Sequence, residues 1–222
     1  MNNPLQAIAI IEAFVSRKEH WEGVYHAKQP TEVSWFQARA TLSARLIAQS
    51  VADHDAPIID VGGGASVLVS GLRSAGYTNL TVLDLSAAAL LVAQASLGAA
   101  ARDVRWIEAD ILEATLPPGG FALWHDRAVF HFLTEAADRR RYVGQARRAV
   151  RTGGHLIIAT FAEDGPTRCS GLEVVRYSSA ALQAEFADGF SLVSAHRETH
   201  RTPAGGVQAF NYCLLQRVSP EV

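Results

Sequence analysis

The sequence predicts an α/β protein built on an open, mostly parallel, doubly wound sheet that ends in an antiparallel hairpin. From residue 57 onward, short β-branched runs alternate with longer helical stretches. Such alternation is typical of βαβ units, in which helices cover both faces of a parallel sheet. Two strand-like runs near the C-terminus, joined through residues 202–206, break this rhythm and predict the hairpin.

Each expected element rests on a local pattern of residues. Short runs rich in Val, Ile, Leu and Phe predict strands, which cover residues 57–61, 80–84, 104–108, 121–124, 156–161, 190–197 and 209–216. Apolar residues at helical spacing predict helices, which cover residues 31–51, 66–74, 87–97 and 134–152. The helix at 87–97 follows Ser86, a favoured N-cap residue, and stops at Gly98.

One compact domain with an N-terminal cap is expected from the length of 222 residues. The residues before the first strand are mostly helical in pattern. We therefore expect residues 1–55 to form a helical cap or lid over a core of residues 56–222.

Composition excludes several classes of partner. The net charge is −2, so no global basic field attracts nucleic acid or an anionic membrane surface. Two cysteines make no disulfide framework, and the chain shows neither a leader pattern nor a long apolar segment. We therefore expect a cytoplasmic protein with no nucleic-acid and no membrane partner. The oligomeric state stays open.

A glycine-rich loop follows the first expected strand, in the stretch IIDVGGGAS over residues 58–66. The order strand, acid, glycines, helix places backbone N–H groups at the carboxyl end of a parallel strand, where ligands bind in open α/β sheets. A dinucleotide fingerprint would need glycine where Val67 stands. The spacing instead matches D-x-G-x-G-x-[GS], and the absence of Cβ atoms lets the backbone approach a ligand.

This loop resembles motif I of class I S-adenosyl-L-methionine (SAM)-dependent methyltransferases, and the resemblance covers residues 55–217. It implies a cofactor site in which the glycine loop holds the amino-acid end. It further implies that a carboxylate after the second strand accepts both ribose hydroxyls, and that an acid after the third strand binds adenine. The residues so implied are Asp60, Gly62, Gly63, Gly64, Ser66, Asp84, Leu85, Asp110 and Ile111.

The N-terminal segments HWEGVY (20–25) and SWFQ (34–37) are similar to a subgroup that holds protein-lysine methyltransferases of elongation factor and citrate synthase. The stretch WHDRA (124–128) is also similar to a segment of thiopurine S-methyltransferases. In both groups, N-terminal aromatic residues close over the cofactor. The alternative is that these aromatic residues are ordinary core anchors. The resemblance adds Trp21, Tyr25, Trp35 and His125 to the expected cofactor site.

Methyl transfer from a sulfonium demands alignment and desolvation, and for some acceptors the removal of a proton. Asp126 and His131 follow the fourth strand and are the candidate catalytic bases. Arg127 is alternatively a structural partner of a carboxylate, and His131 a satisfied core histidine. Cys169 either lines the substrate pocket or is a buried, inert thiol.

His196, Glu198 and His200 alternate along a strand and superficially resemble a metal site. We expect a hydrated sheet surface there instead, and no metal in the protein.

The function predicted is SAM-dependent methyl transfer to a heteroatom of a small molecule, with S-adenosyl-L-homocysteine (SAH) as the product. A protein-lysine N-methyltransferase is the alternative acceptor class. Residues 125–128 contain no Asn-Pro-Pro-Tyr-type tetrapeptide, which argues against a base- or glutamine-methylating enzyme. From other classes, an NAD-type Rossmann oxidoreductase and a non-catalytic cofactor-binding partner protein stay open.

Overall fold

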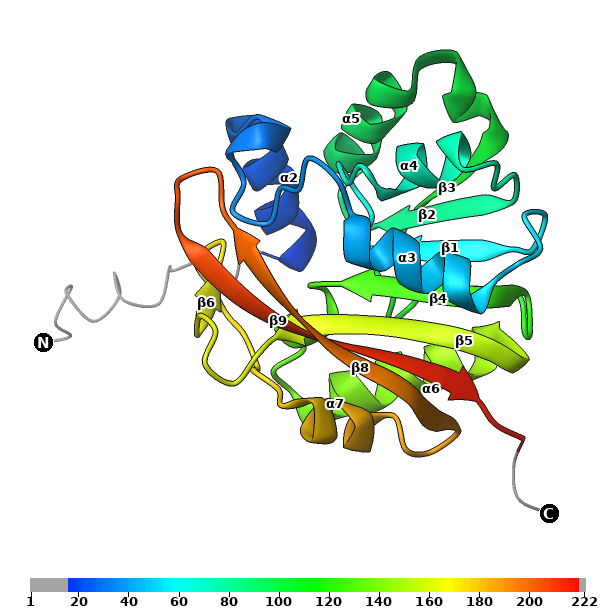
Figure 1. The fold of residues 1–222 in the computed structure, drawn as a ribbon. Helices are drawn as coiled ribbons and strands as arrows, with labels where there is room; N and C mark the ends of the chain where they lie inside the picture. Colours follow the sequence, from blue (N-terminus) through cyan, green and yellow to red (C-terminus); the bar gives the residue numbers. More distant parts are fainter. Residues whose placement is uncertain (1–15, 220–222) are drawn as a thin grey trace, which may run out of the picture.

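A computed structural model describes residues 16–219. A seven-stranded sheet with the order β3-β2-β1-β4-β5-β9-β8 runs through its centre (Figure 1). The first five strands of the chain pair in parallel, whereas β9 is antiparallel to both β5 and β8. The predicted fold class, a mostly parallel doubly wound sheet with an antiparallel C-terminal hairpin, is confirmed.

The strands of the main sheet agree with the expected order. Their bounds are β1 (Ile58–Val61), β2 (Leu80–Asp84), β3 (Val104–Glu108), β4 (Phe121–Arg127), β5 (Val150–Phe161), β8 (Phe190–Arg201) and β9 (Val207–Arg217). Two short strands, β6 (Arg168–Cys169) and β7 (Leu172–Glu173), make a separate hairpin after β5. Because β1 and β2 are buried at every position, both faces of the sheet centre are covered.

Helices cover the two faces of the sheet, and each layer has its own apolar cluster. α6 (Ala136–Ala149) and α7 (Ser179–Glu185) bury Tyr142 and Leu182 in one cluster. α3 (Thr41–Ser50), α4 (Leu68–Ser74) and α5 (Ala87–Leu97) bury Leu46, Leu68 and Leu90 in the other. Among the described residues, no helix combines the length and apolar character needed to cross a membrane.

The predicted helix over 31–51 is only partly correct. A 3-10 turn covers Pro30–Glu32, and residues 33–40 then form a loop before α3 begins. Leu46 and Ile47 of α3 are fully buried in the core. α3 therefore belongs to the helical layer on the sheet, and the lid is formed by α2 (Arg17–Ala27) with the loop 28–40. The part of the expected cap before residue 16 lies outside the described residues.

Other element bounds also differ from the prediction. β4 continues to Arg127 because it pairs with β5 as far as Ala159. β5 begins at Val150 and contains Gly153, which has a φ of +76° at an irregularity in the pairing with β4. α7 is not among the predicted helices; the side chain of its N-cap residue, Ser178, accepts a hydrogen bond from the Ala181 N–H at 3.2 Å.

Polar contacts, together with the aromatic packing of Trp21, hold α2 over the carboxyl edge of the sheet, although none of its residues is fully buried. The Glu22 carboxylate accepts hydrogen bonds from the N–H groups of Ala87 (2.6 Å) and Ala88 (3.3 Å), at the N-terminus of α5. Anions are stabilised at such a helix end. Ion pairs of Lys18 with Glu108 and of Arg17 with Asp138 hold the other side.

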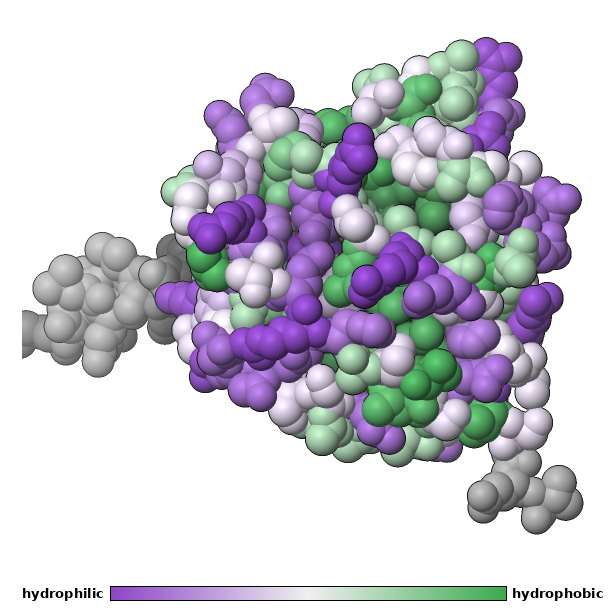
Figure 2. Space-filling view, viewed as in Figure 1, coloured by the Kyte–Doolittle hydropathy of each residue, from purple (hydrophilic) through white to green (hydrophobic). Residues whose placement is uncertain are grey.

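The visible surface is mixed. Figure 2 shows hydrophilic side chains over much of the C-terminal hairpin, with a smaller hydrophobic area toward the C-terminus. Leu192, Val193 and Val218 are among the exposed apolar residues of the chain.

Candidate functional site

A cavity of about 820 Å³, including its open mouth, lies at the carboxyl ends of the parallel strands. This volume lies in the range of small-molecule and cofactor pockets. Its walls come from the strand ends, the turn after β4 and the lid. They are formed by Arg17, Trp21, Tyr25, Trp35, Val61, Gly62, Leu83, Asp84, Leu85, Ala109, Asp110, Ile111, Arg127, Ala128, Val129, Phe132, Leu133 and Cys169.

All three glycines of the loop are closely packed, and a Cβ at Gly63 would lie 2.5 Å from a carboxylate oxygen. Gly62 has a φ of +66°, and a Cβ built there would lie 2.0 Å from Cγ2 of Val129. A Cβ at Gly64 would lie 2.7 Å from Oδ2 of Asp84. The expectation that bare backbone leaves space for a ligand is therefore incomplete, because at Gly62 the space is filled by another side chain of the protein.

A second cavity adjoins the first across Gly62, which lines both, whereas Gly64 lines neither. It is lined by Gly63, Ser66, Asp60 and His125, together with Ser43 of α3. The His125 ring joins Oδ1 of Asp60 through Nδ1 (2.7 Å) and Oγ of Ser43 through Nε2 (2.9 Å). Oδ2 of Asp60 is buried and has no hydrogen-bond partner among the described residues.

Asp84 is buried at the end of β2, and its Oδ1 accepts a hydrogen bond from the Ser86 N–H at 2.9 Å. Burial raises the pKa of its carboxyl to about 6. The backbone N–H groups of Ser86, Gly64 and Leu85 have a smaller, opposite effect, because they favour the ionised form. Near neutral pH, the first cavity therefore contains a poorly solvated carboxylate that can accept further hydrogen bonds.

This pKa predicts a pH dependence of ligand binding. Because the folded pKa is above its ordinary value, the protonated form favours the fold, and that contribution is lost as the pH rises through about 6. A diol donates hydrogen bonds and therefore favours the ionised carboxylate. The affinity for such a ligand should rise with pH, whereas the contribution of this carboxyl to folding stability falls with pH. We expect the affinity for SAH to be about tenfold weaker at about pH 5 than on a plateau above about pH 7.

Calorimetry across this pH range measures the effect, and Asp84→Asn is the matched control because it removes the titration. If the SAH affinity of Asp84→Asn depends on pH as steeply as that of the unmodified protein, another titrating group causes the effect.

Asp110 and Ile111 line the cavity where β3 ends. The carboxylate of Asp110 accepts a hydrogen bond from the Leu112 N–H (2.9 Å), which fixes the turn. Nη1 of Arg17 lies 3.8 Å from Oδ2 of Asp110, so the lid reaches this acid directly.

Aromatic residues form the lid side of the cavity. Trp21, Tyr25 and Trp35 all line it, together with Phe132. Trp21 packs edge-to-face with both Trp35 (5.7 Å) and Phe132 (5.1 Å). Burial raises the pKa of the Tyr25 hydroxyl far above its usual range, so that it stays neutral. Electron-rich ring faces of this kind attract cations.

The candidate bases Asp126 and His131 line neither cavity. Asp126 is fully buried and accepts hydrogen bonds from the Val129 N–H (2.8 Å), the Phe130 N–H (3.1 Å) and the Tyr142 hydroxyl. His131 is fully buried as well, and burial lowers its pKa to about 3. The geometry gives both residues structural roles, which does not support the predicted catalytic assignment.

Asp126→Asn is accordingly expected to change stability. The amide keeps an oxygen for the Val129 N–H but presents a donor to the Phe130 N–H, which should lower the free energy of unfolding by about 1 kcal/mol. Chemical denaturation measures the loss. A large drop in methyl transfer by a folded variant with unchanged SAH affinity would instead restore the catalytic role.

Glu198 and His200 are not on a hydrated surface, which corrects the expectation for this strand. The Glu198 side chain is only 16% exposed and pairs with Arg127. The His200 ring donates from Nε2 to the carbonyl oxygen of Ser34 at 2.8 Å, which ties the lid loop to the hairpin. Among residues 16–219, no group of three His, Cys, Asp or Glu side chains is arranged to hold a metal ion.

Cys169 lines the first cavity. Burial raises the pKa of its thiol to about 11, so it is protonated near neutral pH. It is part of the wall and is unreactive in this state.

Comparison with known proteins identifies a domain in this chain. Residues 58–154 match the protein family described as "Methyltransferase domain". The matched segment runs from β1 into β5 and contains the glycine loop, Asp84 and Asp110.

Curated relatives extend the similarity at low identity. EEF1A lysine methyltransferase 2 of Homo sapiens is 21% identical over 197 residues, which are 82% of this chain and 78% of that protein. An uncharacterized methyltransferase of Mycobacterium tuberculosis is 33% identical over 105 residues, which are 47% of this chain and 50% of that protein. The match therefore spans half the length of the mycobacterial relative.

Solved structures share the fold over nearly the whole chain. The structure described as "Conversion of a Disulfide Bond into a Thioacetal Group during Echinomycin Biosynthesis" has a TM-score of 0.75 at 20% identity and covers 93% of this chain and 94% of that one. The 1,6-didemethyltoxoflavin-N1-methyltransferase of Burkholderia thailandensis, solved with 1,6-didemethyltoxoflavin and SAH, has a TM-score of 0.65 at 19% identity and covers 99% and 92%.

Proposed function

We propose that the chain is a class I SAM-dependent methyltransferase, which its methyltransferase domain and its fold support, and that it transfers the methyl group to a heteroatom of a small molecule. The observation that supports a small-molecule acceptor is the cover that the lid forms over the cavity. Four of its lining residues, Arg17, Trp21, Tyr25 and Trp35, belong to the lid formed by α2 and its following loop. An acceptor must fit beneath this lid, which favours a small molecule over a folded protein surface.

The residues present fit the cofactor. Asp84 is a buried carboxylate that can accept both ribose hydroxyls. Asp110 and Ile111 line the same cavity at the end of β3, which supports our assignment of adenine to that part of the site. The unpartnered Oδ2 of Asp60 is suited to an ammonium group, which would place the amino-acid end near the glycine loop. His125, through its bond to Oδ1, orients that carboxylate.

The bound cofactor supplies a methyl group on a sulfonium, whose sulfur is its own leaving group. The protein supplies alignment and exclusion of water, which lower the barrier of a displacement. Trp21, Trp35 and Phe132 provide the apolar cover. The thiol of Cys169 and the hydroxyl of Tyr25 are both held neutral by burial, so neither acts as a base near neutral pH.

Transfer of a radioactive methyl group from SAM tests the acceptor class. A cell extract is divided by ultrafiltration into small molecules and retained proteins, and each fraction is incubated with enzyme and cofactor. We expect enzyme-dependent label in the small-molecule fraction. Gly62→Val, which should not bind the cofactor, is the control for background transfer. Label confined to proteins would overturn the proposal.

A protein-lysine acceptor is the second candidate, and the similarity to EEF1A lysine methyltransferase 2 over 82% of this chain favours it. Label in the retained proteins that appears as methyl-lysine after complete hydrolysis would establish that activity instead.

A further inference from the structure

Glu198 on β8 joins three separate parts of the chain through one carboxylate. Both of its oxygens accept from Nε2 of Gln37 (3.2 Å each). Oε2 also accepts from Nη2 of Arg127 and from the hydroxyl of Tyr212, at 3.2 Å each. The donors come from the lid loop, the end of β4 and β9. Only 10% of the Arg127 side chain and 16% of Glu198 are exposed, so this ion pair is shielded from water.

Arg127 carries the effect of this carboxylate to the site. Its guanidinium lies over the Phe210 ring at 4.2 Å and donates from Nε to the Tyr212 hydroxyl at 2.8 Å. Nη1 donates to the carbonyl oxygen of Trp35 at 3.3 Å. Both Arg127 and Trp35 line the two cavities, so the groups held by Glu198 form a wall common to both.

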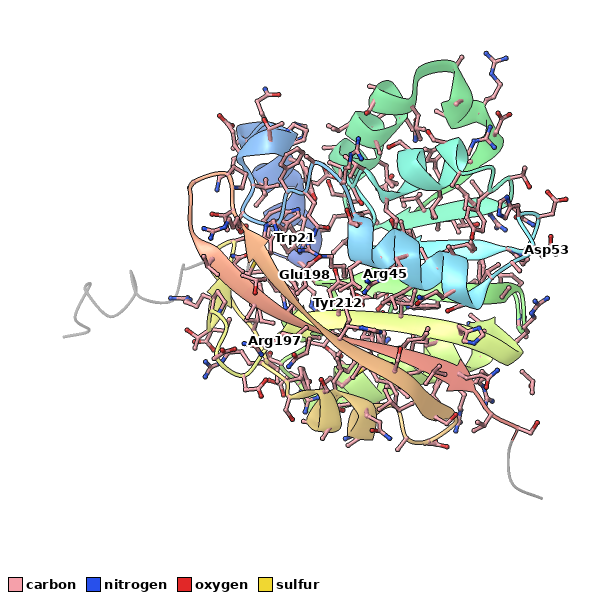
Figure 3. All side chains as sticks on the ribbon, viewed as in Figure 1. Trp21, Arg45, Asp53, Arg197, Glu198 and Tyr212 are labelled. Carbon is pink, nitrogen blue, oxygen red and sulfur yellow. The ribbon has the colours of Figure 1, made fainter. Side chains whose placement is uncertain are left out.

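The neighbouring residue of β8 provides a contrast. In Figure 3, Glu198 and Tyr212 of the hairpin are labelled close together, whereas Arg197 is labelled farther from Trp21. The Arg197 side chain is 46% exposed, and its ion pair with Asp164 touches neither cavity. Successive residues of a strand point to opposite faces, which explains the difference.

We propose that Glu198 is a positioning residue for cofactor binding, which acts by holding Arg127 and the loop residues Trp35 and Gln37 in place. Without this carboxylate, a guanidinium that is only 10% exposed loses its counter-charge, and such a loss is costly at a buried position. Arg127 would then turn toward solvent and release the Trp35 carbonyl. A loosened loop opens the cavity, so a bound cofactor leaves faster.

The test measures SAH binding to Glu198→Gln, which keeps the size of the side chain and removes its charge. We expect the Kd from calorimetry to rise about tenfold, with most of the change in the dissociation rate measured by stopped-flow fluorescence. Arg197→Gln is the matched control, because it removes a charged partner from the adjacent position. Its Kd and dissociation rate should equal those of the unmodified protein.

A merely structural role predicts a different result: a lower melting temperature with an unchanged Kd, which would overturn the proposal.

A double-mutant cycle adds a second criterion. If Glu198 acts through Arg127, the double variant Arg127→Gln/Glu198→Gln binds SAH no more weakly than Arg127→Gln alone, and additive losses would contradict this route. Should Glu198→Gln not fold, Gln37→Leu tests the same loop, with a smaller rise in Kd expected and an unchanged Kd again contradicting the proposal. These measurements need no acceptor, so they are independent of the proposed small-molecule activity.

Discussion

Asp84→Ala is expected to weaken SAH binding by ~1–3 kcal/mol, through loss of charge-assisted hydrogen bonds to the ribose. The carboxylate is buried, so burial has already removed much of its hydration before any ligand arrives. A diol that donates to its oxygens therefore replaces little water. Removing this acid should cost more binding free energy than removing an exposed acid would. Calorimetry with SAH measures the change directly.

Asp84 also accepts a hydrogen bond from the Ser86 N–H, so its loss could disturb the start of α5. Asp84→Asn separates the two roles, because the amide oxygen can still accept from Ser86 while the charge is gone. We expect its affinity to lie between those of the unmodified protein and Asp84→Ala. Asp188→Ala, which removes an exposed acid paired with Arg147, should bind normally. Unchanged affinity in a folded Asp84→Ala protein would remove Asp84 from the ribose site.

The strands of the sheet were predictable because they are short apolar runs whose pattern is local. β2 and β3 have the bounds that the sequence predicts. α3 was predicted too long, because Trp35 has helical spacing with later apolar residues but lies in a loop. That loop is held by Arg127 of β4, which donates to the Trp35 carbonyl, and by the hairpin residue His200, which donates to the carbonyl before it. Local periodicity contains no information about such contacts.

The absence of Asp126 from both cavities has a physical explanation. The sequence predicts a fourth strand that ends at Trp124 and therefore places the residues after it together at the site. β4 in fact continues to Arg127, and alternation along a strand places His125 and Arg127 toward one face and Asp126 toward the other. His125 and Arg127 therefore line the second cavity, whereas Asp126 contacts Tyr142 in the opposite helical layer.

The Glu198 contacts could not be derived from the sequence. Arg127 and Glu198 are separated by 71 positions, and their meeting depends on the register of β9 against both β5 and β8. The alternation of His196, Glu198 and His200 was visible and predicted one common face. What covers that face is the lid loop, and this follows only from the three-dimensional arrangement.

Gly62→Val is expected to abolish measurable SAH binding. Gly62 has a φ of +66°, a conformation that a β-branched residue adopts only at a cost of about 1–3 kcal/mol. Its Cβ would also occupy the position of Val129 Cγ2. Both conflicts are relieved only if the loop moves away from the turn after β4, and these two segments together form the floor of the cavity. Calorimetry together with circular dichroism distinguishes lost binding from lost folding.

Two further variants separate the steric conflict from the backbone conflict. Val129→Ala removes the atom that a new Cβ would meet, so Gly62→Ala/Val129→Ala should bind SAH better than Gly62→Ala does, while remaining weaker than Val129→Ala because the positive φ persists. Gly71→Ala in α4 is the control, since its Cβ would meet nothing within 4 Å. That substitution should leave affinity unchanged, because helical backbone favours alanine over glycine. Normal SAH affinity in a folded Gly62→Val protein would show that the glycine loop does not form the cofactor site.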